Sequence, residues 1–429
     1  MKIVVFLTLL LGTFIQSRAA DIPRHLTLQE AQEICLKQHP RISVANLTAL
    51  AARQATKEVQ SAFFPNIYGS ATAVGNTDPN NTRLAAGALN NPLILDREAD
   101  GIAITQLITD FGRTSELGRS AQLRTRAEEM NVEATREQIL MEVNNAYFSS
   151  LAAQSVLAVA EQTVASRQLI QQQTQTLATN KLKSELDVSF ADVDFDQANI
   201  LLTKARSDLK ASFAILSTLL AERGPRTYAL EDVPMPPNIT NDVSELIQES
   251  LARRPDLARM RYQRDSAKEF ARAQGKLLYP TINAMGAAGV IPAGASQFAS
   301  DYAAAGVNVN IPIYTGGLYT ARKREAEYQA RAADENLRDE EDNIIRDVQV
   351  TKLNLEYTHD RLALTRQLLL NANKALELAQ ARFQNGLSSI IELSQAELNQ
   401  TSAQISETTA RFDYQIQHSA LDFQLGRLR

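Results

Sequence analysis

The chain has 429 residues, with one cysteine and no tryptophan. The single cysteine, Cys35, cannot form a disulfide within the chain, and we expect it to fill space on a helix face. The four histidines lack the spacing of metal ligands, and they stand at His25, His39, His359 and His418. The sequence therefore predicts no metal site and no cofactor.

Motifs of the common enzyme classes are also missing. The sequence contains no Walker loop, no dinucleotide fingerprint and no nucleophile elbow. Asp192, Asp194 and Asp196 have the spacing that opens a calcium loop, but the glycine and glutamate that complete such a loop are absent. We expect these aspartates to be solvated or to line a pore. We therefore predict that the chain is not an enzyme. The alternative of an exported hydrolase is disfavoured, because the sequence offers no set of catalytic residues.

Charge of one sign is not concentrated in any segment. The net charge of −5 is spread along the chain. No cluster of Lys and Arg provides a surface for phosphate groups. We therefore expect no nucleic acid partner.

Long hydrophobic runs are lacking beyond the N-terminus. No later segment reaches the roughly 18 apolar residues of a transmembrane helix. At the N-terminus, Lys2, the apolar run 3–15 and the small residues Ser17 and Ala19 form a signal-peptide pattern. A membrane anchor is the alternative, but the apolar run is shorter than the roughly 20 residues that span a bilayer. We expect residues 1–19 to be a signal peptide and the rest to be exported.

The chain contains one internal repeat. His39-Pro40 is followed by Phe64-Pro65, and 215 residues further on Arg254-Pro255 is followed by Tyr279-Pro280. Each set indicates an amphipathic helix that ends at a proline and turns into a strand. The first repeat is expected at 20–221 and the second at 244–429. A proline-rich, extended linker at 222–243 joins them.

Each repeat contains two short predicted strands, near 64–75 and 100–109 in the first and near 279–291 and 302–313 in the second. The clearest strand alternates Val307, Val309, Ile311 and Ile313 with Asn308 and Asn310. Beyond the first strand, matching positions in the two repeats lie 205 residues apart instead of 215. This difference places ten extra residues in a polar loop at 76–91. Four strands cannot close a barrel of useful width. Either several copies complete one barrel, or the sheet caps a soluble helical bundle.

Two long helices follow the strands, from about 118 to 179 and from about 318 to 384. Neither contains a proline or an internal glycine, so each extends for about 90 to 100 Å. The second has large apolar residues at every seventh position: Val348, Leu355, Leu362, Leu369, Leu376 and Phe383. A tip and a returning helix follow each, near 186–220 and 390–426. The predicted fold class is mainly α, with long coiled-coil hairpins and a small β part.

The order of these motifs resembles the TolC family of outer-membrane factors. The resemblance is found at Phe64-Pro65 and Tyr279-Pro280, in the strand-to-helix segments 106–112 and 311–317, and in the tip segment 383–393. It implies a homotrimer in the lipid of the Gram-negative outer membrane. Four strands from each chain would complete a twelve-stranded β-barrel, and the hairpins would form a tunnel through the periplasm. It also implies a passive duct for efflux or type I secretion, whose partners are a periplasmic adaptor protein and an inner-membrane transporter.

The resemblance further implies a gate at the tip. Glu392 matches an acidic gate position, whereas Gln395 stands where a second acid is expected and Ser388 where some members have an arginine. Asp187 matches a residue that bonds to an aromatic hydroxyl, but Phe383, at the aromatic position, has no hydroxyl. A symmetric ring of Glu392 carboxylates favours cations. The alternative is that Glu392 is a solvated charge in the first turn of a helix.

Two further groups of residues are implied. Candidate adaptor contacts are Asn180, Leu182, Asn385, Gly386 and Leu387, although Asn385-Gly386 also suits a tight turn. Candidate strand-to-helix turns contain Gly112, Gly316 and Gly317. A different class of function, a secreted or periplasmic coiled-coil scaffold or adhesin, is the alternative, but such a protein has no need for two matched pairs of strands.

Overall fold

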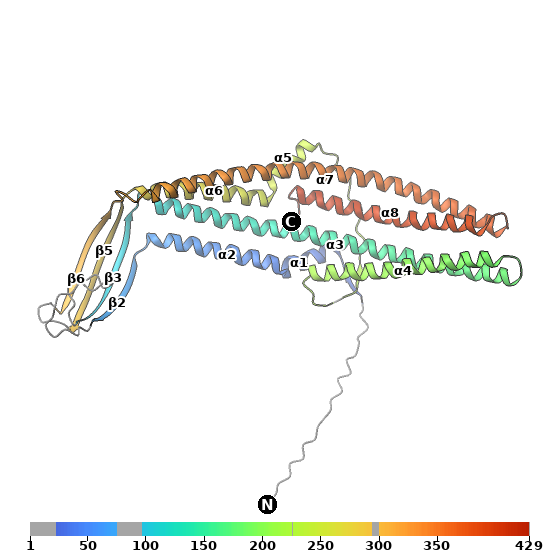
Figure 1. Ribbon diagram of the computed structural model, residues 1–429, viewed down its shortest axis with the longest axis horizontal. Coiled ribbons are helices and arrows are strands. Elements are labelled where there is room, and N and C mark those ends of the chain that lie inside the picture. The colour runs from blue at the N-terminus through green and yellow to red at the C-terminus, as the bar shows by residue number, and fades with distance from the viewer. Residues whose placement is uncertain (1–22, 75–96, 225, 294–299, 429) are drawn as a thin grey trace, which may run out of the picture.

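The computed structural model describes residues 23–74, 97–224, 226–293 and 300–428. The molecule is elongated, with a curved sheet at one end and two helical hairpins reaching the other (Figure 1). The predicted signal peptide 1–19 and the polar loop 76–91 lie outside the described residues. Within the described ranges, no helix combines the length and the hydropathy of a membrane span.

Each half begins with two helices, where the sequence predicted one. α1 (Leu28–Gln38) and α2 (Pro40–Gln60) are separated at His39, and α5 (Val243–Arg253) and α6 (Pro255–Gly275) are separated at Arg254. Both junction residues are extended, with φ −67° and ψ 125° at His39 and φ −63° and ψ 123° at Arg254. A proline disfavours the helical conformation in the residue before it, so the first helix stops and the second starts with its proline in the first turn.

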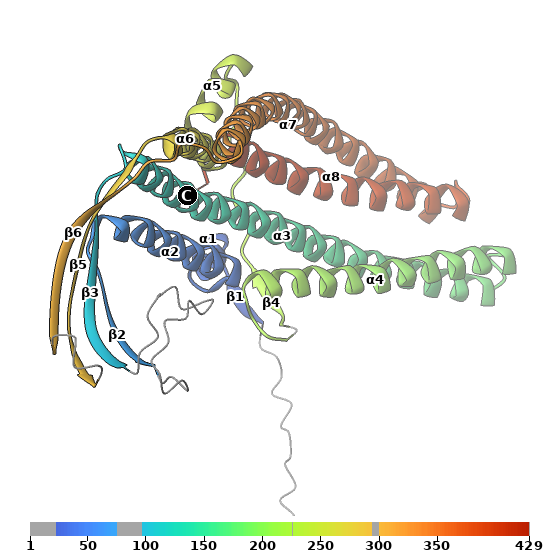
Figure 2. The ribbon, with the colours of Figure 1, turned by 60° about the vertical axis from the view of Figure 1, so that its left-hand side comes forward.

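Four antiparallel strands form the curved sheet in the order β2, β3, β5, β6 (Figure 2). Their bounds are β2 (Asn66–Val74), β3 (Arg97–Thr109), β5 (Thr281–Ala293) and β6 (Asp301–Asn310). Gly289 allows close packing in β5, because a β-carbon there would lie 2.2 Å from the carbonyl oxygen of Asp100. β6 ends before the predicted limit of 313, since Pro312 has no amide hydrogen to continue the ladder.

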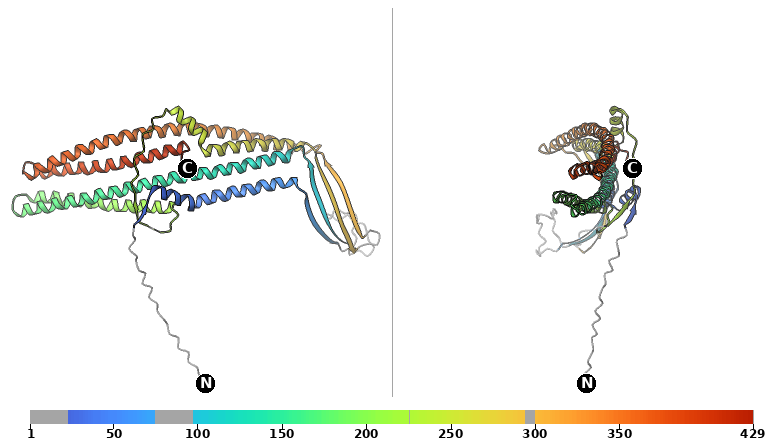
Figure 3. Two further views of the ribbon diagram at one scale, coloured as in Figure 1. Left: turned by 180° about the vertical axis from the view of Figure 1, so that it is seen from behind. Right: turned by 90° about the vertical axis from the view of Figure 1, so that its right-hand side faces the viewer.

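Two hairpins of equal size extend from the sheet and lie side by side (Figure 3). α3 (Arg113–Thr179) and α7 (Leu318–Gln384) have 67 residues each, and the returning helices α4 (Glu185–Leu219) and α8 (Ile390–Gln424) have 35 each. The predicted heptad of α7 faces inward, with Val348, Leu355 and Leu362 buried. The predicted fold class, mainly α with long hairpins and a small β part, is confirmed.

A core at mid-length ties the two halves together. β1 (Arg24–Leu26) pairs in parallel with β4 (Tyr228–Leu230), so the linker between the repeats contributes a strand. The buried Tyr147 of α3 joins both, because its hydroxyl lies 2.9 Å from the Leu26 carbonyl oxygen and accepts a hydrogen bond from the Glu231 amide at 3.1 Å.

Cys35 fills space in this core. Its thiol donates to the carbonyl oxygen of Leu219 at 3.0 Å, and its side chain is fully buried. Burial raises the pKa of the thiol to about 12. The group therefore stays protonated and unreactive at neutral pH.

Candidate functional site at the helical tip

Each long helix starts from a turn with two consecutive residues in the left-handed region. These are Phe111 and Gly112 before α3, with φ of 58° and 88°, and Gly316 and Gly317 before α7, with φ of 62° and 84°. Glycine adopts positive φ without a steric penalty. The candidate turn glycines therefore lie where the chain leaves the sheet, and they set the direction of both hairpins.

Large apolar side chains are exposed around these turns. We name them the junction collar: Phe63, Phe64, Phe111, Leu278, Tyr279, Ile311, Ile313 and Tyr314. Ile313 and Tyr314 are 94% and 88% exposed. Phe111 and Tyr279 come from different halves, and their ring centroids lie 5.8 Å apart. Exposed apolar and aromatic patches of this kind are typical of the boundary between a bilayer and water.

The two tips close with the same kind of turn. Its residues are Asn180-Lys181-Leu182 after α3 and Asn385-Gly386-Leu387 after α7. Lys181 and Gly386 are left-handed, with φ of 60° and 71°. The Leu182 and Leu387 amides donate to carbonyl oxygens in the last helical turn at 2.9 and 2.8 Å, as in a Schellman motif. Each leucine side chain is 70% exposed, so the tip presents two apolar points.

The two candidate acids lie at equivalent places, Asp187 in the first turn of α4 and Glu392 in the first turn of α8. Asp187 accepts a hydrogen bond from the backbone amide of Ser184 at 2.9 Å, which holds the pKa of its carboxyl below the usual value. Glu392 forms an ion pair with Arg382, with 3.1 Å between Oε1 and Nε. No sequence motif marks this pairing, in which Arg382 of the same hairpin offsets the Glu392 charge.

The other gate candidates differ in their surroundings. Gln395 donates to the side chain of Asn399 on its own helix at 3.0 Å. The Ser388 hydroxyl oxygen is buried and has no hydrogen-bond partner among the described residues. Phe383 contacts the other hairpin, because Lys183 Nζ lies 4.5 Å from its ring centroid. A cation is attracted to an aromatic face. A cation–π contact thus joins the hairpins at the position where the resemblance implied a bond to an aromatic hydroxyl.

A buried charged cluster joins the two hairpins further from the tip. We name it the inter-hairpin cluster: Arg167 on α3, Asp194 on α4, and Ser394 and Glu397 on α8. Arg167 forms an ion pair with Glu397 and lies 3.4 Å from Asp194 Oδ2. The Ser394 hydroxyl donates to the same Asp194 oxygen. Arg167 and Glu397 side chains are 7% and 5% exposed. Burial raises the pKa of Glu397, and the Arg167 charge opposes that shift.

The heptad pattern of α3 contains a signal for this cluster, although no short sequence motif marks it. Arg167 stands between Ala160 and Thr174 at intervals of seven, and all three are buried. A charged residue at a buried seam position requires a partner, since an unpaired buried charge is costly. Asp194, one of the three aspartates that were expected to be solvated or to line a pore, is half-buried and belongs to this cluster.

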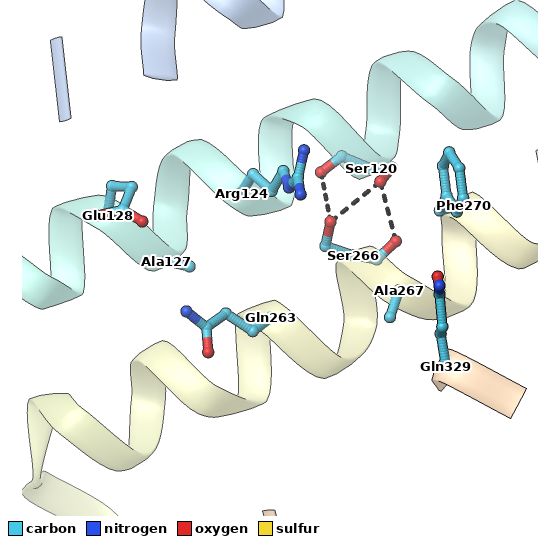
Figure 4. A pocket seen from close by; sticks show the side chains of 9 residues that line it. All are labelled: Ser120, Arg124, Ala127, Glu128, Gln263, Ser266, Ala267, Phe270 and Gln329. Atoms are coloured by element: carbon cyan, nitrogen blue, oxygen red, sulfur yellow. Dashed lines mark hydrogen bonds between the residues drawn. The ribbon is translucent and has the colours of Figure 1, made fainter. Parts of the chain in front are cut away.

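A cavity of about 530 Å³ lies between α3 and α6, beside α7 (Figure 4). Ser120 and Ser266 face each other at its wall, and each hydroxyl donates to the backbone carbonyl of the other at 2.9 Å. These small side chains let α3 and α6 approach closely. In the described part of the chain, no three His, Cys, Asp or Glu residues gather where they could hold a metal ion.

The architecture defines the class, because a curved four-stranded sheet that continues into repeated helical hairpins is the fold of outer-membrane channel proteins. The channel OprN superposes with a TM-score of 0.79 over 93% of this chain and 89% of that protein, at 21% identity. VceC of Vibrio cholerae also superposes with a TM-score of 0.79, over 93% and 96% of the two chains, at 17% identity. At these identities the likeness shows the fold.

Sequence comparison identifies the family within this class. The family model described as outer membrane efflux protein matches residues 32–222 and 246–427, and the chain belongs to this family. Outer membrane protein TolC of Vibrio cholerae is 25% identical over 69% of this chain and 69% of the relative. TolC of Salmonella enteritidis is 22% identical over 94% and 83%. The family comprises outer-membrane channels, so the predictions of the family and of a protein that is not an enzyme are confirmed.

Proposed function

We propose that three copies of this chain form a passive exit duct in the outer membrane, as the channel of a tripartite efflux or type I secretion system. In this proposal a β-barrel crosses the outer membrane and the hairpins form a tunnel in the periplasm. The tip meets a periplasmic adaptor protein and, through it, an inner-membrane transporter. Family membership supports the channel function. The observation that carries the assembly is a pair of unpartnered apolar rows on opposite edges of the protomer.

These rows lie on α7 and α4, the two outer helices of the hairpin pair (Figure 1). The α7 stripe consists of Val350, Tyr357, Leu364 and Leu378, which are spaced by seven or fourteen residues. The α4 stripe consists of Leu186, Val193 and Ile200, spaced by seven. All of these side chains are exposed in the single chain. Apolar residues at heptad spacing are the seams through which helices pair.

Two different stripes on opposite edges suit a head-to-tail contact that closes into a ring. The sheet has matching edges, since β2 and β6 are its outer strands. An unpaired strand edge is not tolerated in lipid. Pairing β6 of one copy with β2 of the next would complete a barrel, with twelve strands from three copies. The same neighbouring copy would thus bury the apolar stripes and pair with the strand edges.

The junction collar supports a membrane boundary at the strand-to-helix turns. Its aromatic and aliphatic side chains are exposed between the sheet and the helices. Such residues are enriched where a membrane protein passes through the lipid headgroups. We therefore assign the sheet to outer-membrane lipid and the hairpins to the periplasm.

We assign gating and docking to the tip. A ring of Glu392 carboxylates would favour cations, with Arg382 offsetting part of the charge. The further gate candidates are Gln395, Asp187, Phe383 and Ser388. The candidate adaptor contacts are Asn180, Leu182, Asn385, Gly386 and Leu387, of which the exposed leucines are the apolar anchors. Substrate would pass through passively, and the partners would supply the energy.

Membrane fractionation followed by unheated gel electrophoresis tests the assembly. We expect the protein in the outer-membrane fraction, and after detergent extraction we expect a trimer that resists SDS until it is heated. Heating the same sample is the control, because the heated protein should run on the gel only as the monomer. Recovery as a soluble monomer from the periplasm or the medium would overturn the duct and favour a scaffold or adhesin.

A further inference from the structure

We propose that the cavity between α3 and α6 is a binding site for a small organic anion that carries hydroxyl groups, of the chemical class of the sugar acids. The lining side chains come from α3, α6 and α7 of one protomer (Figure 4). The site therefore does not depend on the assembly of copies, and it goes beyond the channel function. Its volume of about 530 Å³ suits a small molecule, since such sites span about 300 to 1,000 Å³.

Small side chains form the floor of the cavity. Ser120 and Ala127 lie on one face of α3, and both are buried. Ser266 and Ala267 lie on the side of α6 that lines the same cavity. The hydroxyls of the two serines donate to each other's backbone carbonyl oxygens, so they are already satisfied. Recognition of a ligand therefore falls to the longer side chains at the rim.

The rim combines a cation, an acid, two amides and an aromatic ring: Arg124, Glu128, Gln263, Gln329 and Phe270. The side chains of Arg124 and Gln263 form no hydrogen bond or ion pair with any described residue. Gln329 donates to Glu325 of its own helix at 3.2 Å, which leaves its amide oxygen available. The rim thus has free donors and acceptors that face one hollow.

Arg124 differs from cationic side chains at the neighbouring helix contacts. Arg53 of α2 pairs with Glu129 of α3, and Lys268 of α6 pairs with Asp334 of α7, each at 2.7 Å. Arg124 lines the contact between α3 and α6 but has no such partner in the described part of the chain. A guanidinium binds a carboxylate through two parallel hydrogen bonds. Arg124 is therefore the group that would hold the anionic end of a ligand.

The surrounding charge also favours an anion. Helix α6 contains five basic and three acidic residues. The one acid of the rim, Glu128, already accepts a hydrogen bond from Asn131 at 3.3 Å. A cleft lined by an excess of one charge raises the local concentration of ligands of the opposite charge. A cationic ligand would lack this attraction and would be repelled by Arg124.

The uncharged groups of the rim indicate the rest of the ligand. The amides of Gln263 and Gln329 can donate to hydroxyl groups and accept from them. The ring of Phe270 is 37% exposed, so it offers an apolar surface to the carbon–hydrogen face of a sugar ring. A simple inorganic anion would use Arg124 alone, and an aromatic acid would leave the amides unpaired. A sugar acid uses every group of the rim.

Ligand-observed NMR titration of the full-length, detergent-extracted protein tests the site. Glucuronate is the probe, and glucose and glucosamine are matched sugars without charge and with positive charge. We expect glucuronate to bind with a dissociation constant of about 1 mM and the other two sugars to bind about tenfold more weakly or less, because only glucuronate can pair with Arg124.

Two variants separate the rim from the floor. Arg124→Gln should weaken glucuronate binding about tenfold, to the level of glucose, and leave glucose unchanged. Ala267→Leu should abolish binding of all three sugars, because it fills the hollow while Arg124 stays in place. Circular dichroism checks that both variants keep the helix content of the wild type. Arg126→Gln is the matched control, since Arg126 is exposed on α3 and does not line the cavity.

The outcomes that would overturn the proposal are distinct. Equal binding of glucuronate, glucose and glucosamine would show that Arg124 does not recognise an anion. Equal loss in the Arg124→Gln and Arg126→Gln variants would show attraction to surface charge without a site. Absence of glucuronate binding to the folded wild type would refute the site, and a trimer that conducts in the same preparation would leave the channel function standing.

Discussion

Glu392 forms an ion pair with Arg382 across the tip turn, and both side chains are about half exposed. The net field of a ring of such pairs depends on both partners. A carboxylate alone attracts cations, whereas a guanidinium a few ångströms away weakens the attraction. The ion selectivity of the tip is therefore set by the balance of the pair.

We expect Glu392→Gln to move the cation-to-anion permeability ratio toward unity, because each protomer loses a negative charge at the constriction. Arg382→Gln should move the same ratio in the opposite direction, since it leaves Glu392 uncompensated. Reversal potentials in a salt gradient across a planar bilayer measure both. Glu407→Gln, which alters an ion pair further from the tip on α8, serves as the control. Selectivity that is unchanged in both tip variants would remove Glu392 from the gate.

Residue-level contacts at the tip were predictable only in part. The absence of a hydroxyl on Phe383 is evident from the sequence, and so is the tight turn at Asn385-Gly386. The partner that Phe383 has instead, Lys183, could not be predicted, because the register between the two hairpins brings them together. Arg167 and Glu397 are 230 residues apart, so no local pattern links them.

Among the helices, α7 has both a buried and an exposed heptad row. Val348, Leu355 and Leu362 face the protomer core, whereas the α7 stripe faces outward. A helix with two apolar rows is expected to contact neighbours on two sides. In a single chain the α7 stripe lacks such a neighbour, which is why we assign it to the contact with the next copy.

We expect Leu364→Glu to abolish the SDS-resistant trimer while helix content stays unchanged. Burial of a leucine contributes about 1.5–3 kcal/mol, and the substitution removes this contribution and adds a charge at every interface of the ring. Unheated gels and circular dichroism measure the two effects. Gln367→Glu introduces the same side chain one turn away, outside the stripe, and should leave the trimer intact. A trimer that survives Leu364→Glu would contradict the assignment of this stripe.

The bounds of the elements followed from local signals where those signals were strong. Helix α7 was predicted at about 318 to 384 and is observed at Leu318–Gln384, because glycines flank it on both sides. Helix α3 starts at Arg113, before the predicted 118, since Gly118 is accommodated inside the helix. The break at His39 was not predicted, although Pro40 restricts that residue.

At the scale of the whole molecule, the internal repeat explains the architecture. The two long helices have equal length, and so do the two returning helices, so both hairpins reach the same level. The repeat could be recognised in the sequence because its proline, glycine and heptad positions recur at a nearly constant separation. The contacts between the halves could not be predicted from the sequence, because the parallel pairing of β1 with β4 depends on how the halves pack.

The central claim is that copies of this chain assemble into one continuous duct from the outer membrane to the tip. The most direct measurement is the single-channel conductance of the detergent-extracted, unheated trimer in a planar bilayer. We expect one stable, cation-selective pore for each trimer inserted. Intact trimers that insert into the bilayer and carry no current would contradict it.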